Sequence, residues 1–139
     1  MKIVEESINK QIIETYKDEL FLFAETEEDL KDKHILKVID EYNEVVSIAM
    51  YSNLDNEELE LYIDGSKQNN VKDTICKGIY LDAITSLKKG YNVCKYIIGY
   101  LMDKNKTIWC YSYCDAVEFW KNKMNWFDLG ENIFVNQLS

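Results

Sequence analysis

The chain has 139 residues, 47% of them apolar, which is enough for one packed core and too few for two. Its net charge of −9 argues against duplex DNA or RNA as a partner, because phosphate binding needs clustered cationic side chains. No apolar run reaches the length of a membrane span, and the N-terminus lacks the apolar segment of a signal peptide. We therefore expect a single domain over residues 1–139, located in the cytoplasm, with neither nucleic acid nor membrane as a partner.

Charge is unevenly distributed along the chain. Residues 1–65 carry 18 acidic residues and 6 lysines, a net charge of −12, whereas residues 66–139 carry 7 and 10, a net charge of +3. A solvated acidic face would explain this asymmetry. A sharper interpretation is that the first half attracts a cation and the second half accommodates an anionic ligand.

Thiols and imidazole are too few and too scattered for a regular metal site. Cys76, Cys94, Cys110 and Cys114 form no CxxC pair, and His34 is the single histidine. We expect no metal and predict buried free thiols. Cys110 and Cys114 are interpreted as core thiols because no histidine lies near them in sequence, and His34 as a structural residue.

The first segment of the chain predicts a short strand followed by two helices. Residues 1–4 are β-prone, and Ser7 can cap a helix that continues to about residue 23. Thr26 and Asp29 resemble an acidic capping box that opens a short helix to residue 32. The apolar face of the first helix consists of Ile8, Ile12, Ile13, Tyr16 and Leu20.

Three strands are predicted next. Residues 34–40 and 45–51 are strand-like and flank a turn at 41–44, which is typical of a hairpin. Residues 58–64 alternate between an apolar and a polar face, and this polar face carries Glu58, Glu60 and Tyr62.

Residues 71–89 carry apolar side chains at helical spacing and end before Gly90, a residue suited to follow a helix. The apolar positions are Cys76, Ile79, Tyr80, Ala83, Ile84 and Leu87. Residues 96–102 then read as a buried strand.

The last third predicts a strand, a helix and a closing hairpin. Residues 107–111 are β-like, and Asp115 can cap a helix to residue 123 with Ala116, Phe119 and Trp120 inward. Residues 127–129 and 133–135 flank Gly130 as a hairpin. The predicted order is β-αα-βββ-α-β-α-ββ.

Three stretches, taken in this order, resemble the GNAT superfamily of acetyl-CoA-dependent N-acetyltransferases over nearly the whole chain. Residues 61–73 look like the family's fourth strand and the loop after it. Within this stretch, residues 68–73 keep the first position of the family's Gln/Arg-x-x-Gly-x-Gly/Ala motif and replace both small residues. Residues 96–103 look like its fifth strand, and residues 116–127 look like its A-x-x-F-Y…G-F ending, with Trp120 in place of tyrosine. The resemblance implies an α/β (α+β) fold with a central mixed, mostly antiparallel sheet and helices on both faces.

The resemblance also implies acetyl-CoA as co-substrate, with its pyrophosphate on the backbone N–H groups of this loop. The implied binding residues are Gln68, Asn69, Asn70, Val71, Lys72 and Asp73. The branched Val71 obstructs close approach and Asp73 adds negative charge, so affinity should be reduced, and Lys67 and Lys72 partly compensate.

A second register is open. Residues 79–86 would be the fourth strand, 87–92 the phosphate loop and 107–111 the fifth strand. We favour the first register because it needs no extra strand and ends the long helix at Gly90. The helix of the second register would bury Val93, Tyr96, Ile97, Tyr100 and Leu101.

Amine acetylation needs a base for the ammonium and an acid for the departing thiolate. Glu58 and Glu60 on the predicted fourth strand are candidates for a base that acts through water, although each taken singly is better explained as a solvent-facing carboxylate. The family's acid is a tyrosine of the last helix, and Trp120 has no such proton. Tyr111 or Tyr113 could replace it, unless they are ordinary core or surface aromatics.

Two functions follow from these residues. The first is direct acetyl transfer from acetyl-CoA to a primary amine of a small molecule or peptide, for which the acidic first half suits a cationic acceptor. The second is a catalytically weak or inactive GNAT-fold binding module that acts through its acidic surface, with a homodimer as a candidate assembly.

Overall fold

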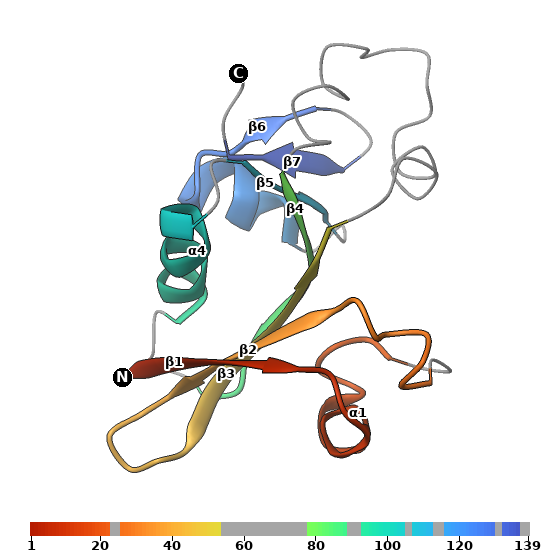
Figure 1. Ribbon diagram of the computed structural model, residues 1–139. Helices are drawn as coiled ribbons and strands as arrows, with labels where there is room; N and C mark the ends of the chain where they lie inside the picture. Colours follow the sequence, from red (N-terminus) through yellow and green to blue (C-terminus); the bar gives the residue numbers. More distant parts are fainter. Residues whose placement is uncertain are drawn as a thin grey trace. The chain divides into compact units, whose positions relative to one another are not determined.

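The computed structural model of the chain describes residues 1–22, 26–53, 78–88, 93–104, 107–112, 116–129 and 132–136. These residues contain no helix that is long and apolar enough to cross a membrane. In chain order the elements are β1 (Lys2–Ser7), α1 (Lys10–Tyr16), β2 (His34–Ile39), β3 (Val45–Ser52), β4 (Ile79–Ser86), α4 (Val93–Lys104), β5 (Ile108–Tyr111), the π-helix η2 (Phe119–Lys123), β6 (Phe127–Asp128) and β7 (Ile133–Val135) (Figure 1).

The residues group into two compact units, Met1–Ser52 with Asp82–Leu101, and Asn53–Leu81 with Met102–Ser139. The strands are hydrogen-bonded in the order β1-β2-β3-β4 in the first unit and β4-β5-β7-β6 in the second, so β4 contributes to both. Strands β4 and β5 run parallel, whereas the pairs β1–β2, β2–β3, β5–β7 and β6–β7 are antiparallel. The predicted mixed, mostly antiparallel sheet is confirmed.

The first helix begins later than predicted. Strand β1 pairs with β2 from Lys2 to Ser7, so Ser7 lies opposite His34 in the ladder and does not cap a helix. The cap is Asn9, whose Oδ1 accepts a hydrogen bond of 2.9 Å from the N–H of Ile12. The predicted capping box of Thr26 and Asp29 is present, with Thr26 N–H donating to Asp29 Oδ2 at 2.9 Å, but the residues after it form successive turns.

The hairpin of β2 and β3 forms as predicted and is closed by one carboxylate. Asp40 Oδ1 accepts the N–H groups of Tyr42 and Glu44, each at 2.9 Å. Asn43 supplies a left-handed residue with φ 62°, a conformation that asparagine tolerates better than most side chains. Asp40 thereby fixes the turn that joins the two strands.

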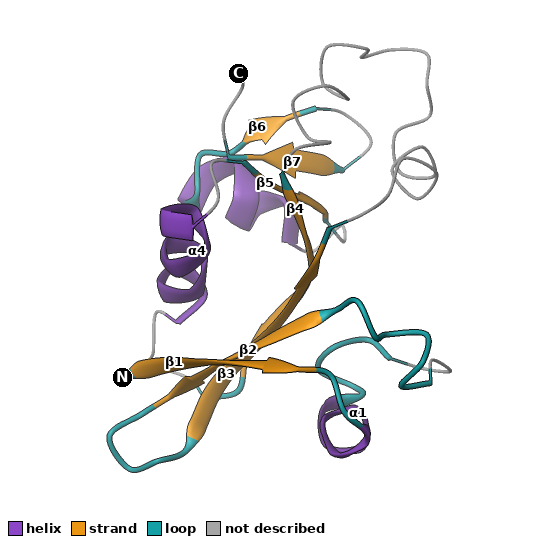
Figure 2. Cartoon of the chain, viewed as in Figure 1, coloured by secondary structure: helices purple, strands orange, loops and turns teal. Residues whose placement is uncertain are grey.

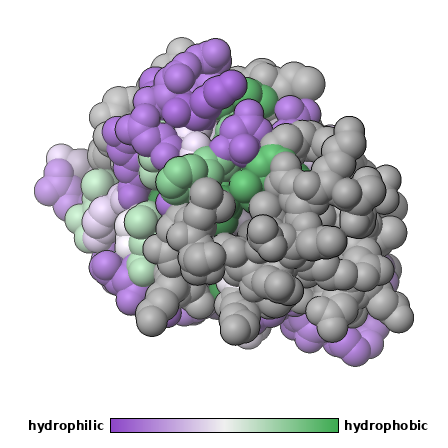
Figure 3. Space-filling model, turned by 90° about the horizontal axis from the view of Figure 1, so that it is seen from above, coloured by the Kyte–Doolittle hydropathy of each residue, from purple (hydrophilic) through white to green (hydrophobic). Residues whose placement is uncertain are grey.

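In the first unit the strands β1, β2 and β3 lie side by side (Figure 2). The core of this unit is formed by α1 and the strands. It confirms the predicted apolar face of the first helix, since Ile13 and Tyr16 pack against the same cluster. The buried members are Ile8, Ile12, Leu20, Leu22, Leu30, Ile35, Ile48, Met50 and Ala83. In the view of Figure 3, hydrophobic residues cover less of the described surface than hydrophilic residues do, and hydrophilic residues border them.

The favoured register is wrong for residues 79–102, and the second register is confirmed there. Residues 79–86 are strand β4 rather than the end of a helix, and residues 96–102 belong to helix α4 rather than to a strand. The apolar residues of β4 are buried along most of its length, so its sequence lacks the alternation that marks a half-exposed strand. A short buried apolar run fits a strand and a helix equally well.

Helix α4 buries the stripe of Ile97, Ile98 and Leu101, whereas Tyr96, which the second register predicted to be buried, is 42% exposed. Two of its tyrosines reach β1, because Tyr96 Oη donates to the carbonyl of Met1 at 3.3 Å and Tyr100 Oη to Glu5 Oε2 at 3.4 Å. These bonds fix the orientation of α4 against the first strand.

The other oxygen of Glu5 accepts a hydrogen bond from Tyr51, whose ring stacks on His34 at 4.8 Å between centroids. Burial, together with the negative charge of Glu5, raises the pKa of the Tyr51 hydroxyl. His34 begins β2 as predicted, and its structural role stays a prediction.

The second unit is held by aromatic packing and by a closed hydrogen-bond pair. Trp109 of β5 contacts Tyr80 of β4 at 4.5 Å between ring centroids, and Trp120 contacts Trp126 at 4.6 Å. The Ile108 N–H donates to Asn136 Oδ1 at 2.8 Å, and the Asn136 N–H donates to the Ile108 carbonyl at 3.1 Å. The predicted closing hairpin is confirmed as β6 and β7.

Two glycines offer a matched test of this packing. A Cβ on Gly78 would lie 2.6 Å from the carbonyl oxygen of Thr107, whereas a Cβ on Gly99 meets nothing within 4 Å. Gly78→Ala should destabilise the protein by about 1–3 kcal/mol through this overlap. Gly99→Ala should stabilise it by about 1 kcal/mol, because alanine favours the helix. Urea denaturation measures both, and equal effects would contradict the packing described.

Candidate active site

The connection from β4 to α4 is the first part of the site. It starts with Leu87 and Lys88, and the Leu87 N–H donates to the carbonyl of Val46 at 2.8 Å. Helix α4 begins at Val93, and residues 89–92 lie outside the described part of the chain. The first N–H groups of a helix lack partners within it and lie at the positive end of its dipole. The start of a helix can therefore bind an anion.

Lys88 provides a cation at the end of β4. Its ammonium forms ion pairs with two carboxylates of the β2–β3 turn, Glu44 and Asp40, the latter at 3.8 Å. The Lys88 carbonyl accepts a hydrogen bond of 2.9 Å from Ser86 Oγ. Lys88 thus joins the end of β4 to the hairpin electrostatically.

A second charged group lies on β4 itself. Asp82 Oδ1 accepts a hydrogen bond of 2.7 Å from Lys33 Nζ, and Asp82 Oδ2 accepts one of 2.8 Å from Ser52 Oγ. Lys33 also donates to Ser52 Oγ at 3.1 Å. The side chains of Lys33 and Asp82 are only 18% and 12% exposed, so this ion pair is largely shielded from water.

Burial raises the pKa of Asp82, and the charge of Lys33 with the two hydrogen bonds offsets part of that rise. A shielded carboxylate with a raised pKa and a bound primary ammonium has the properties of a proton acceptor or of an amine-binding group.

Asp82 was not among the predicted site residues, because the favoured register placed it in a helix. The signal that could have found it is a lone carboxylate within the apolar stretch of residues 79–86. A charge at that position of a buried strand needs a partner, since an unpaired one is costly.

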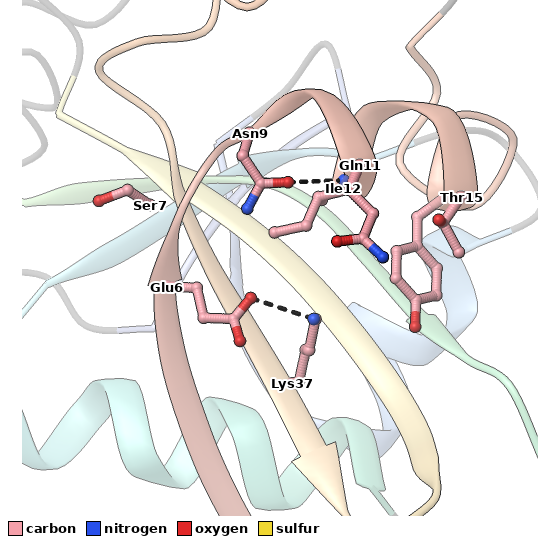
Figure 4. A pocket seen from close by; sticks show the side chains of 8 residues that line it. Glu6, Ser7, Asn9, Gln11, Ile12, Thr15 and Lys37 are labelled. Atoms are coloured by element: carbon pink, nitrogen blue, oxygen red, sulfur yellow. Dashed lines mark hydrogen bonds and ion pairs between the residues drawn. The ribbon is translucent and has the colours of Figure 1, made fainter.

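A polar pocket of about 540 Å³ lies between β1 and α1 (Figure 4). Glu6 and Lys37 form an ion pair of 3.0 Å beside it. Asn9, Gln11 and Thr15 add amide and hydroxyl groups to its lining, so it can accept a small polar molecule.

Among the predicted catalytic residues, only Tyr111 lies in the described part of the chain. It ends β5 and is 44% exposed. The other candidates, Glu58, Glu60 and Tyr113, lie outside the described residues, as do the predicted cofactor residues 68–73, so their roles stay predictions.

Of the two thiols that the structure describes, Cys110 is buried as predicted, whereas Cys94 is half-buried. Cys110 is 3% exposed, and burial raises the pKa of its thiol well above the usual range, which keeps it protonated. This confirms Cys110 as a core residue. The described residues contain no group of three His, Cys, Asp or Glu side chains that could hold a metal ion.

Solved structures of acetyltransferases share this fold. The chain aligns with the Bacillus subtilis N-acetyltransferase YlbP in complex with coenzyme A at TM-score 0.56 and 14% identity, over 96% of this chain and 94% of that one. It aligns with the histone acetyltransferase HPA2 and related acetyltransferase from Corynebacterium glutamicum at TM-score 0.58 and 10% identity, over 100% and 98%. No protein-family model and no curated protein matches the sequence. The chain therefore resembles the GNAT superfamily in fold.

Replacement of Lys33 tests the shielded ion pair. In Lys33→Met the pKa of Asp82 should rise further above its unfolded value of 3.8, because the compensating cation is gone. A carboxyl group whose pKa is higher in the folded than in the unfolded state stabilises the fold at pH values below the unfolded-state pKa. This stabilisation is lost as the pH rises through the folded-state pKa. The loss relative to the parent should therefore be small near pH 4 and reach about 3 kcal/mol at pH 7.

Urea denaturation at both pH values measures this difference. Lys31→Met is the matched control, because Lys31 and Glu28 form an exposed pair of 3.2 Å that contributes little. A Lys33→Met deficit that is the same at pH 4 and pH 7 would contradict the role of Asp82.

Proposed function

We propose that this protein is a GNAT-type N-acetyltransferase of the cytoplasm that moves an acetyl group directly from acetyl-CoA to a primary amine. The observation that supports the proposal is the position of Lys88, two residues after the end of β4 and five before the start of α4 in the sequence. This arrangement lies in a chain that shares its fold with an acetyltransferase bound to coenzyme A.

The residues at the end of β4 provide some of the groups that bind a diphosphate. Lys88 supplies a positive charge and the first turn of α4 supplies N–H groups. Asp40 and Glu44 oppose anion binding, because both carboxylates lie beside Lys88. We therefore expect cofactor affinity to be modest.

We propose Asp82 as the residue that receives the acceptor's proton, with Glu58 and Glu60 as further candidates. The ammonium of Lys33, held by Asp82 and Ser52, has the same chemical group as a primary-amine substrate. Because Asp82 already binds one alkylammonium, its carboxylate suits an acceptor amine. Tyr111 remains the candidate for protonating the departing thiolate.

A cationic acceptor is supported by the charge of the first half of the chain. Residues 1–65 carry a net charge of −12. Glu6 lines the pocket beside α1, and Glu27 and Glu28 line a second pocket with Ile8. These carboxylates would attract a small-molecule or peptide amine that carries positive charge.

A GNAT-fold binding module without turnover is the second candidate function. Trp120, at the place of the tyrosine in the family's ending, is 4% exposed and packs against Phe119 and Trp126. A buried indole cannot protonate a thiolate. This module would act through its acidic surface, with a homodimer as its proposed assembly.

Cofactor binding is tested by thermal denaturation with acetyl-CoA, since a ligand that binds only the native state raises Tm. We expect a rise at millimolar acetyl-CoA. The charge reversal Lys88→Glu should reduce it strongly, whereas Lys72→Glu should do so only if residues 68–73 form the phosphate loop. No rise with the unmodified protein at 5 mM, roughly 100 times an ordinary cofactor KM, would favour a module that does not use acetyl-CoA.

Catalysis is tested by thiol release from acetyl-CoA with a panel of primary amines. Asp82→Asn should lower kcat about 10²–10⁴-fold with little change in acetyl-CoA affinity, because it removes a proton acceptor. Asp103→Asn, on the exposed part of α4, is the matched control and should retain activity. Full activity of folded Asp82→Asn would exclude Asp82 as the base.

A further inference from the structure

Three charged side chains meet where β4 ends, and we call them the Lys88 cluster: Lys88, Asp40 and Glu44. The Lys88 ammonium lies 3.8 Å from Asp40 Oδ2 and forms a closer ion pair with Glu44 Oε2. The side chain of Asp40 is 3% exposed, that of Lys88 38% and that of Glu44 58%. The cluster thus extends from the protein interior to solvent.

The carboxylate of Asp40 stabilises the position of the Lys88 ammonium in this cluster. The two hydrogen bonds of the turn both go to Oδ1 of Asp40. Its Oδ2 is buried and has no hydrogen-bond partner. An unpartnered buried carboxylate oxygen is costly, and a nearby cation reduces that cost. The Lys88 ammonium faces this oxygen.

The backbone holds the cluster together. The Leu87 N–H bonds to the Val46 carbonyl at 2.8 Å, and Ser47 Oγ bonds to the Thr85 carbonyl at 2.9 Å. These two bonds fix the end of β4 against the start of β3. The backbone at the end of β4 therefore stays beside the hairpin, and the Lys88 side chain is the part that can change partners.

We propose that the Lys88 cluster controls anion binding at the end of β4 by an exchange of partners. This inference rests on the proposed function. In the free protein Glu44 and Asp40 neutralise the ammonium of Lys88. An incoming diphosphate replaces Glu44 as the ion-pair partner of this ammonium. Asp40 stays in place because it closes the turn, and the exposed Glu44 is the carboxylate that can be displaced.

Glu44 is thus a residue that sets affinity without contacting the ligand. Its removal should tighten binding of a polyanion, which is the opposite of what the loss of a structural ion pair would do. Because exposed and half-buried ion pairs contribute modestly, the expected gain is about three- to fivefold in Kd.

The experiment measures the Kd of coenzyme A by isothermal titration calorimetry for a double-mutant cycle. The proteins are the unmodified chain, Glu44→Gln, Lys88→Gln and the double variant. Glu41→Gln is the matched control, since Glu41 is an exposed carboxylate of the same turn. Circular dichroism verifies that each variant is folded.

We expect Glu44→Gln to bind coenzyme A three- to fivefold tighter, Glu41→Gln to bind as the unmodified chain does, and the gain to vanish in the Lys88→Gln background. Unchanged or weaker binding by Glu44→Gln would overturn the inference while the proposed function stands. A gain that persists without Lys88 would also overturn it, because Glu44 would then act directly on the anion. If no protein of the set binds coenzyme A, the proposed function fails as well.

Discussion

The pairing of β3 with β4 is the interaction on which the charged groups around β4 depend. The hydrogen bond from Leu87 to Val46 and that from Ser47 to Thr85 fix which residues of the two strands lie opposite each other. Asp82 consequently lies beside Ser52, and Lys88 lies beside the β2–β3 turn. A shift by one residue would turn these side chains to the other face of the sheet. The register of one strand pair therefore determines the chemistry at the end of β4.

Two lysines of the first unit are bound by carboxylates that other segments supply. Lys33 is paired with Asp82 in a shielded position, and Lys88 with Glu44 and Asp40 in a more open one. Both pairs hold the segments before β2 and after β4 to their neighbours. Both also place a primary ammonium next to a carboxylate, so the same contacts that stabilise the fold oppose ligands that must compete for them.

The shared fold and the residues of this chain support the proposed function in different ways. Solved acetyltransferases at 10–14% identity establish the arrangement of strands and helices, which many functions can use. Asp82, Lys88 and the start of α4 are the features of this chain that support the proposal of acetyl transfer. Buried Trp120, which the sequence resemblance aligns with the family's tyrosine, is the residue that most favours the proposed binding module.

The sequence alone determined the hairpin of β2 and β3, the apolar face of α1 and the closing hairpin, because each carries a local signal in turn residues or spacing. It also indicated the family that this fold resembles. It did not decide between two registers for residues 79–102, because a buried apolar run satisfies a helix and a strand equally well. Only tertiary structure decided that, since β4 needs its neighbouring strands to form. The pairing of Asp82 with Lys33, 49 residues apart, likewise exists only once the strands are side by side.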